Sequence, residues 1–285
     1  MSNLCVLCDE HEADFDQYLC GDCAKEFQVD SSNVRLFYRF LATVGRSYLS
    51  SFVAGTKTPE EQSYIFSAPA VNFHNARRFN FFCRIAEIVR GIPGDIVECG
   101  VEHGQSLLFW LSIAFDELTP RNVWGFDSFT GPESVTENDA NAVGDVWRPK
   151  IGSYSDKTTQ NFINALNAYG LPAIWTNSHL TIVPGFFSKT LNDYKGERIA
   201  ILHLDCNYYD SYRACLETLW PKVVQGGVVV FDEYSGTNDL LHFNGAKKAI
   251  DEWNSEVGRQ TILRDKMYGK YYLVKWEVLS CTDGN

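Results

Sequence analysis

Apolar runs of strand length alternate with stretches of helical spacing from about residue 79 onward. The apolar runs cover 94–100, 122–129, 180–187, 199–205 and 227–234, and the stretches of helical spacing cover 78–92, 104–118, 158–171, 211–224 and 245–257. Strands separated by helices of this length form a doubly wound, mostly parallel sheet. The segments 261–265 and 270–276 follow with the pattern of a closing hairpin. The pattern predicts an α/β fold with helices covering one sheet.

The first 78 residues do not share this pattern. Residues 33–55 carry apolar side chains at helical spacing, and prolines interrupt the mixed stretch after them. His74, Arg77 and Arg78 are candidates for substrate contact, but we favour the interpretation that they are solvated surface. We expect three parts: a cysteine module at 1–28, a helical linker or lid at 29–78, and the main domain at 79–285.

Four of the nine cysteines form two C-x-x-C pairs separated by eleven residues: Cys5, Cys8, Cys20 and Cys23. Each pair brings two thiolates to one ion, and two pairs complete the tetrahedral shell of a structural Zn²⁺. Metal binding would also supply the folding energy of a module with hardly any core. Two local disulfides or unpaired thiols are the alternatives, and His11 is a candidate substitute ligand. We expect the other five cysteines to be small core residues with reduced thiols.

Charge and composition limit the classes of binding partner that we expect for this chain. The 285 residues are 45% hydrophobic and carry a formal net charge of −11. An acidic chain is a poor general binder of phosphate backbones, so we expect no nucleic-acid partner. No apolar stretch approaches membrane-spanning length, and the N-terminus lacks the core of a signal peptide. We therefore expect no membrane contact and a cytoplasmic location.

Acidic residues end four of the predicted strands: Glu98, Asp127, Asp205, and Asp232 with Glu233. Ligands of doubly wound sheets bind beyond the carboxyl ends of the strands. The loop after the first strand reads E-x-G-x-x-x-G, which differs from the dinucleotide-binding G-x-G-x-x-G. Its carboxylates, Glu98 and Glu102, would repel a pyrophosphate and suit the ammonium and sulfonium of S-adenosylmethionine. Asp127 is placed to accept hydrogen bonds from two ribose hydroxyls.

Three of these acids follow the fourth and fifth strands, whose ends we expect to lie together. Asp205, Asp232 and Glu233 in one cleft would repel one another unless a cation sat among them. Oxygen ligands with open positions suit Mg²⁺, Mn²⁺ or Ca²⁺ better than Zn²⁺. The alternative is that Asp205 caps the following helix and the other two are solvated turn residues.

Five motifs occur in order along this domain: GDIVECGVEHGQS, VWGFDSFTGPE, LTIVPGFFSKTL, ILHLDCNYYDSYRACLETLWPKVVQGGVVVFDEY and GAKKAIDEW. Together they resemble the macrocin O-methyltransferase family over residues 75–255. The resemblance implies a class I methyltransferase (Rossmann-like) fold, S-adenosylmethionine as methyl donor, Mg²⁺ at the acidic strand ends and a sugar hydroxyl as acceptor. It implies contacts with the methyl donor for Glu98, Gly100, Gly104, Ser106, Asp127 and Ser128, and metal ligation by Asp205, Asp232 and Glu233.

The chain departs from the family pattern at three points. Asn207 stands where the family usually has the second aspartate of D-G-D, and Glu233 where it has the second of two aspartates. Members also tend to supply a histidine after the second or third strand, but no histidine lies between His103 and His179. The altered acids put the metal geometry in question, and the missing histidine leaves the general base open.

Asp205 and Asp210 are the candidates that we favour for catalysis. Tyr208 and Tyr209 are alternative bases or pocket-lining residues, and water suffices if a metal acidifies the acceptor hydroxyl. His203 lies inside an apolar run, so we expect a core residue rather than a catalyst.

Three functions from different classes follow from these observations. The favoured one is a metal-dependent O-methyltransferase acting on a hydroxyl of a sugar or polyol-bearing small molecule, with a homodimer implied by the resemblance. The second is a catalytically weak methyltransferase-like scaffold recruited through its zinc module, which Asn207 and the missing histidine favour. The third, a dinucleotide-dependent oxidoreductase, is disfavoured by the acidic loop.

Overall fold

The computed structural model describes residues 73–117, 119–139, 159–235 and 243–276. The predicted cysteine module and the linker up to residue 72 lie outside these residues. The first described helix, α4 (Phe73–Ile88), runs without a break across the boundary predicted between residues 78 and 79. Because its buried side chains belong to the core over the sheet, α4 is part of the main domain.

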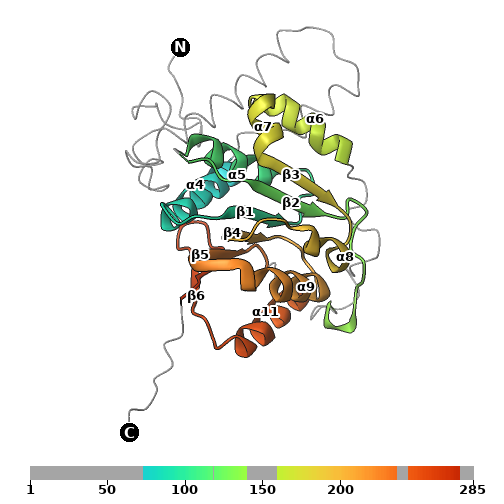
Figure 1. Cartoon of the computed structure of the whole chain (residues 1–285). Coiled ribbons are helices and arrows are strands. Elements are labelled where there is room, and N and C mark those ends of the chain that lie inside the picture. Colours follow the sequence, from blue (N-terminus) through green and yellow to red (C-terminus); the bar gives the residue numbers. More distant parts are fainter. Residues whose placement is uncertain (1–72, 118, 140–158, 236–242, 277–285) are drawn as a thin grey trace.

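Seven strands form one sheet in the order β3-β2-β1-β4-β5-β7-β6 (Figure 1). They are β1 (Asp95–Cys99), β2 (Val123–Asp127), β3 (Leu180–Pro184), β4 (Ile199–Leu204), β5 (Val223–Phe231), β6 (Ile262–Arg264) and β7 (Tyr271–Val274). The strands β1 to β5 pair in parallel, whereas β7 runs antiparallel to both β5 and β6. The predicted mostly parallel sheet and its closing hairpin are confirmed.

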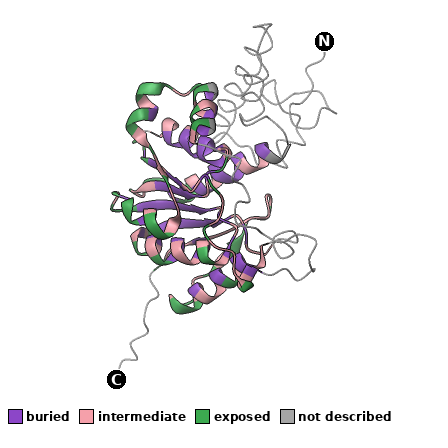
Figure 2. Cartoon of the chain, turned by 90° about the vertical axis from the view of Figure 1, so that its right-hand side faces the viewer, coloured by how far each residue is buried: buried purple, intermediate pink, exposed green. Residues whose placement is uncertain are grey.

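Helices cover both faces of this sheet, which is buried between them (Figure 2). Besides α4, the helices are α5 (Gln105–Asp116), α6 (Thr159–Tyr169), α7 (Ala173–His179), α8 (Phe187–Thr190), α9 (Tyr209–Leu219) and α11 (Asn244–Glu256). Successive strand residues face opposite layers: Ile201 packs with α4 and α5, and Leu202 packs with α9 and α11. Burial on both faces explains why the central strands read as continuous apolar runs.

Some element boundaries differ from those predicted. The strand expected at 180–187 ends at Pro184, because Gly185 adopts a φ of +139° and turns the chain into α8. The pattern also missed α7, and β5 begins at Val223, four residues before the predicted start. Single 3₁₀ turns occupy Glu137–Asp139, Leu191–Asp193 and Trp220–Lys222. None of the described helices has the length and apolar character needed to cross a bilayer.

The register of the central strands brings their carboxyl ends to one level. Cys99 pairs with Leu204, and Leu204 pairs with Phe231. One further hydrogen bond continues each ladder: the amide of Asp205 donates to the carbonyl of Cys99, and that of Asp232 to Leu204, both at 2.9 Å. The residues that follow β1, β4 and β5 are therefore neighbours at the edge where doubly wound sheets bind ligands.

Candidate active site

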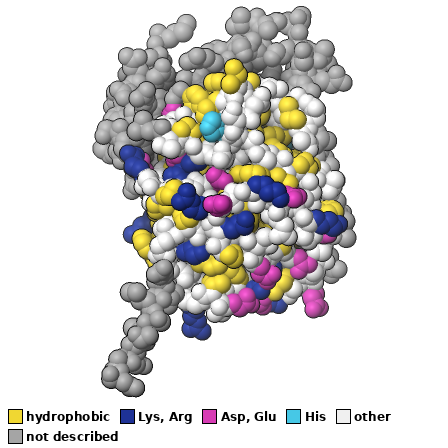
Figure 3. Space-filling view, in the orientation of Figure 1, with side chains coloured by type: hydrophobic (Ala, Val, Ile, Leu, Met, Phe, Trp, Pro, Cys, Tyr) yellow, Lys and Arg dark blue, Asp and Glu magenta, His cyan; other side chains and the backbone are white. Residues whose placement is uncertain are grey.

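A cavity of about 610 Å³ opens at this edge of the sheet. Most of the predicted site residues line it: Glu98, Gly100, Ser106, Asp127, Ser128, Asp205, Asp210, Asp232 and Glu233. Gly104 begins α5 behind this wall and does not line the cavity. Four separate strand ends thus contribute to one site. The face seen in Figure 3 carries basic and acidic side chains interspersed.

The loop after β1 is shaped by two glycines in left-handed conformations. Gly100 has a φ of +98°, and a Cβ there would lie 1.7 Å from the carbonyl oxygen of Asp205. Gly104 has a φ of +83°, and a Cβ there would lie 2.4 Å from the ring of Phe162. Only glycine permits this close approach of the β1 loop to the end of β4 and of α6 to the start of α5.

Asp127 holds the same loop through its carboxylate. Its Oδ2 accepts hydrogen bonds from the amides of Val101 at 2.7 Å and Glu102 at 2.8 Å, and its Oδ1 accepts one from the amide of Phe129 at 2.7 Å. Each carboxylate oxygen has two lone pairs. Asp127 therefore orders the loop and retains acceptor capacity at the cavity wall.

Glu98 and His203 form a buried pair below the cavity. Glu98 Oε1 lies 3.0 Å from His203 Nδ1, and the two residues are 1% and 0% exposed. Trp110 Nε1 donates to the same nitrogen at 3.3 Å, so the proton between Glu98 and His203 belongs to the carboxyl group. Burial, and next the charge of Asp205, raise the pKa of Glu98 well above its usual value. Burial lowers the pKa of His203 to about 3, so both groups are neutral.

Two protein cations surround Asp232. Lys270 Nζ donates to its Oδ2 at 2.9 Å and to its carbonyl oxygen at 2.6 Å, and Arg78 Nη2 lies 3.8 Å from its Oδ1. Burial raises the pKa of Asp232, but the charges of Lys270 and then Arg78 outweigh burial and hold the pKa below its usual range. Asp232 is therefore ionised.

Asp205 differs from Asp232 in having no comparable ion pair. Burial, followed by the charge of Asp232, raises the pKa of Asp205 to about 7, while Arg78 and Lys270 partly offset this. One ring nitrogen of His203 and one carboxylate oxygen each of Asp205 and Asp232 lie within 4.8 Å of one another. His203 Nε2 is buried without a hydrogen-bond partner. The two carboxylates form an oxygen donor set that suits a hard divalent cation, whereas His203 Nε2 carries the ring proton because Nδ1 accepts from Trp110.

Glu233 was predicted as the third metal ligand, but the group of three contains His203 in its place. Its Oε2 accepts hydrogen bonds from Tyr212 Oη at 2.8 Å and from the amide of Asn207 at 3.2 Å. The side chain is 3% exposed, and burial together with the charge of Asp205 raises its pKa well above the usual value. The carboxyl group of Glu233 therefore bonds protein groups, although the residue also lines the cavity.

Sequence reasoning missed two site residues, Arg78 and Lys270. The expectation that Arg78 is solvated surface is wrong: its side chain is 16% exposed and lines the cavity. The position follows from α4, which packs across the sheet and carries Arg78 over the strand ends. The charged residue directly before the apolar Phe79 in a core helix was the available signal. Lys270 precedes β7, and no local motif marks it.

The remaining predicted residues lie at the rim or away from the site. Asp210 Oδ2 accepts a hydrogen bond from Ser134 Oγ at 2.6 Å at the cavity rim. Tyr208 lines the cavity, whereas Tyr209 Oη donates to Glu252 on α11 at 2.5 Å and does not line it. Aromatic side chains of Phe186, Phe187 and Phe243 complete the wall.

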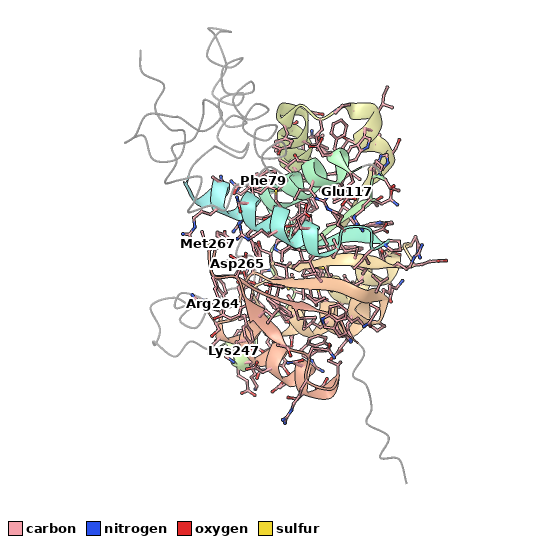
Figure 4. All side chains as sticks on the ribbon, turned by 90° about the vertical axis from the view of Figure 1, so that its left-hand side faces the viewer. Phe79, Glu117, Lys247, Arg264, Asp265 and Met267 are labelled. Atoms are coloured by element: carbon pink, nitrogen blue, oxygen red, sulfur yellow. The ribbon has the colours of Figure 1, made fainter. Side chains whose placement is uncertain are left out.

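The α4 helix is fixed to the β6–β7 hairpin near the site (Figure 4). Arg84 donates to both carboxylate oxygens of Asp265, at 2.8 and 2.9 Å from Nη2. Asp265 Oδ1 also accepts a hydrogen bond from the amide of Tyr268 at 2.6 Å. The hairpin that supplies Lys270 is thereby attached to the helix that supplies Arg78.

Comparisons with known proteins agree with this geometry. The sequence model of the Macrocin-O-methyltransferase (TylF) family matches residues 68–263. An 8-demethyl-8-(2,3-dimethoxy-alpha-L-rhamnosyl)-tetracenomycin-C 4'-O-methyltransferase of Streptomyces olivaceus is 30% identical over 185 residues, 62% of this chain and 67% of that protein. Mycinamicin III 3''-O-methyltransferase of Micromonospora griseorubida is 27% identical over 182 residues, 60% of this chain and 68% of the relative.

Solved structures share the fold. The O-methyltransferase NovP superimposes with a TM-score of 0.57 at 24% identity, covering 72% of this chain and 81% of NovP. The calicheamicin methyltransferase CalS11 superimposes with a TM-score of 0.60 at 19% identity, covering 86% of this chain and 93% of CalS11. At these identities the likeness concerns the fold alone.

Proposed function

The chain belongs to the macrocin O-methyltransferase family, and we propose that it methylates a hydroxyl group on a sugar carried by a small molecule. Family membership makes it an S-adenosylmethionine-dependent O-methyltransferase. The sugar acceptor is supported by matched relatives, one of which is by name a methyltransferase of a rhamnosyl tetracenomycin. The observation that carries the proposal is the meeting of four acidic strand ends around one cavity.

We place the methyl donor against the loop after β1. Gly100 and Gly104 let the loop pack closely against Asp205 and Phe162, and Asp127 retains acceptor capacity for one ribose hydroxyl. The neighbouring Ser128 Oγ donates to the carbonyl of Gly131 at 2.5 Å, which fixes the next turn of the cavity wall. Acidic groups around the cavity favour the positively charged sulfonium and ammonium. Glu98 supports the loop from below as a neutral carboxyl group.

Asp205 and Asp232 would hold a divalent cation, Mg²⁺ or alternatively Mn²⁺ or Ca²⁺, and Glu233 would support Asp205 from behind. The geometry supports this: the two carboxylates lie within reach of one ion, and Glu233 is bonded to Tyr212 and Asn207. Such an ion, when bound, lowers the pKa of an acceptor hydroxyl.

The protein groups then position the acceptor and receive its proton. Asp205 is our candidate general base at the strand ends; its pKa of about 7 applies to the metal-free site, since a cation held by Asp205 would lower it. Asp210 and Ser134 at the rim offer hydrogen-bonding groups for a sugar, and Phe186, Phe187 and Phe243 offer apolar surface. The hydroxyl oxygen attacks the methyl carbon as the carbon–sulfur bond of the sulfonium breaks, which leaves S-adenosylhomocysteine.

A direct test combines the protein with S-adenosylmethionine and a panel of small molecules with and without sugar groups. We expect S-adenosylhomocysteine and a singly methylated product only with glycosylated acceptors, and loss of product in EDTA with recovery on adding Mg²⁺ or Mn²⁺. Methylation of aglycones alone would overturn the sugar acceptor, and an undiminished rate in EDTA would overturn the metal.

We further propose that Cys5, Cys8, Cys20 and Cys23 bind one structural Zn²⁺ and that the enzyme is a cytoplasmic homodimer. The double C-x-x-C spacing supports the zinc site. Elemental analysis of the purified chain should find about one zinc per chain. Substituting the four cysteines by serine should remove it, and zinc retained by that variant would overturn the site.

A further inference from the structure

The methyl donor carries a negative group that the acidic cavity does not obviously accommodate. S-adenosylmethionine has a carboxylate beside its ammonium, and the cavity wall is rich in carboxylates. Among the described residues that line the cavity, Arg78 is the single lysine or arginine. We propose that Arg78, together with Ser106, binds the carboxylate of the methyl donor. This assignment rests on the proposed function and specifies a residue within it.

The Arg78 side chain is held so that its guanidinium faces the cavity. Its Nε donates to Tyr268 Oη at 3.0 Å, and its Nη1 donates to Ser106 Oγ at 3.1 Å. These bonds use two of the five N–H groups of an arginine. The orientation is thus fixed by one residue of the β6–β7 hairpin and one of α5, and a planar donor fork held in this way suits a carboxylate.

Asp232 does not form a direct hydrogen bond with Arg78. Arg78 Nη2 lies 3.8 Å from Asp232 Oδ1, beyond hydrogen-bond distance, whereas Lys270 donates directly to Asp232 Oδ2 at 2.9 Å. Lys270 therefore supplies the direct ion pair. Arg78 contributes at longer range and can pair with a ligand carboxylate without leaving Asp232 unpaired.

Ser106 provides a second contact on the same side. Its hydroxyl oxygen accepts the hydrogen bond from Arg78, so its own proton can be donated to a ligand. Ser106 is the second residue of α5, whose start at Gly104 has no side-chain cap. The amides of this first turn add positive potential where the carboxylate would lie. Arg78 comes from α4, whereas Ser106 and the helix start come from α5. In the sequence, 28 residues separate Arg78 from Ser106.

The assignment is tested by comparing two ligands that differ only in the carboxylate. S-adenosylhomocysteine carries it, and S-adenosyl-3-thiopropylamine is the same molecule without it. Titration calorimetry on the full chain should show that wild-type protein binds S-adenosylhomocysteine on the order of 10- to 100-fold more tightly. In Arg78→Gln this preference should fall to about threefold or less, because only the carboxylate-bearing ligand loses a charged partner.

Matched variants separate this result from a general loss of structure. Arg77→Gln changes the neighbouring arginine, which bonds the carbonyl of Met267 and does not line the cavity, so it should keep the wild-type preference. Arg78→Lys should keep part of the preference, since it retains the charge but loses the fork. Binding of the decarboxylated ligand by Arg78→Gln shows that the site remains folded.

If Arg78→Gln weakens the binding of both ligands equally, or of neither, the assignment of Arg78 is overturned and the proposed methyltransferase function is not. If Arg78→Gln binds neither ligand, the Arg78→Lys variant provides the test. An Arg78→Lys variant that keeps the full wild-type preference for S-adenosylhomocysteine would also overturn the assignment. Wild-type protein that binds neither ligand would overturn the proposed site itself.

Discussion

Asp205 lies among groups that move its pKa in opposite directions. Burial and the charge of Asp232 raise it to about 7, and Arg78 and Lys270 limit the rise. Asp232, only one strand away, is ionised because Lys270 bonds it directly. Two similar carboxyl groups thus differ in protonation because of their neighbours, as acid and base groups in active sites do.

The raised pKa of Asp205 predicts how stability depends on pH when metal is removed. Its pKa of about 7 in the folded protein lies above the ordinary aspartate value of 3.8, so between these values the folded state binds more protons than the unfolded state. The free energy of unfolding should therefore fall as pH rises from 5 to 8, with Asp205 contributing on the order of a few kcal/mol. Glu98 and Glu233, also raised, act in the same direction.

Urea unfolding in EDTA at pH 5 and pH 8 measures this difference. Asp205→Asn should reduce it, and Asp193→Asn, which changes an acid that is 60% exposed, should not. A free energy of unfolding that rises over this pH range, or an equal difference in both variants, would contradict the assignment.

Replacing each candidate base by asparagine distinguishes the role of Asp205 from that of Asp210. Asp205→Asn should lower kcat by roughly 10²- to 10⁴-fold, because it removes both a proposed metal ligand and the proposed proton acceptor among the strand ends. Asp210→Asn, at the rim with Ser134, should mainly raise KM for the acceptor. Steady-state kinetics with the acceptor found in the panel decide between them, and a kcat loss confined to Asp210→Asn would reverse the roles.

Individual residues were predictable where a strand end marks them. Glu98, Asp127, Asp205 and Asp232 follow apolar runs, so the sequence placed them at one edge. Contacts between distant segments leave no such mark. The prediction that His203 is a core residue does not reveal its bond to Glu98, because that bond depends on the register of β1 with β4.

At the scale of elements, α4 and the β6–β7 hairpin support the site together. Arg84 on α4 binds Asp265 of the hairpin, and Tyr268 of the hairpin bonds Arg78 of α4. The Arg84 and Asp265 side chains are 22% and 12% exposed. A bidentate, partly buried pair of this kind contributes more than a surface ion pair.

Arg84→Ala should lower the free energy of unfolding by about 1–3 kcal/mol. It should also weaken the binding of S-adenosylhomocysteine several-fold, because the hairpin that orients Arg78 loses its attachment to α4. Arg213→Ala removes a pair whose acids, Glu217 and Glu256, are each 55% exposed, so its effect should stay within about 1 kcal/mol. Denaturation and calorimetry on both variants check this, and equal losses would show that the α4–hairpin pair has no special part.

The β1 loop makes a sharper prediction. Gly100→Ala introduces a Cβ against the backbone of Asp205 at a left-handed residue, so it should cost at least about 1–3 kcal/mol and abolish measurable methyl-donor binding. Gly91→Ala also has a left-handed φ of +76°, but nothing lies within 4 Å of its Cβ, so it should cost about 1 kcal/mol and leave binding unchanged. Gly100→Ala with normal donor binding would contradict the close approach of the two strand ends.

Periodicity predicted the elements that carry long apolar patterns and missed the short ones. The five parallel strands and the hairpin were found because each carries a run of apolar residues in the sequence. The seven-residue α7 and four-residue α8 are too short for a helical period to appear. The strand expected through residue 187 ended early because Gly185 turns the chain, a conformation that glycine permits but does not require.

At the scale of the whole molecule, one sheet brings the site together from both ends of the described chain. Arg78 belongs to α4, the first described helix, and Lys270 to the β6–β7 hairpin, the last described element; Figure 1 shows the sheet that α4 covers. Alternating helices and strands predicted this architecture and the edge that binds ligands. They did not predict the two cations, since the contacts of α4 with the hairpin depend on the pairing of β7 with β5, which no local pattern marks.

The most direct measurement is a calorimetric titration of S-adenosylmethionine into the full chain purified without chelator, with and without Mg²⁺. We predict binding in the micromolar range, and its loss in Asp127→Ala, whose carboxylate orders the β1 loop. Absence of binding by the wild-type chain under both conditions would contradict the assignment of this cavity as the methyl-donor site.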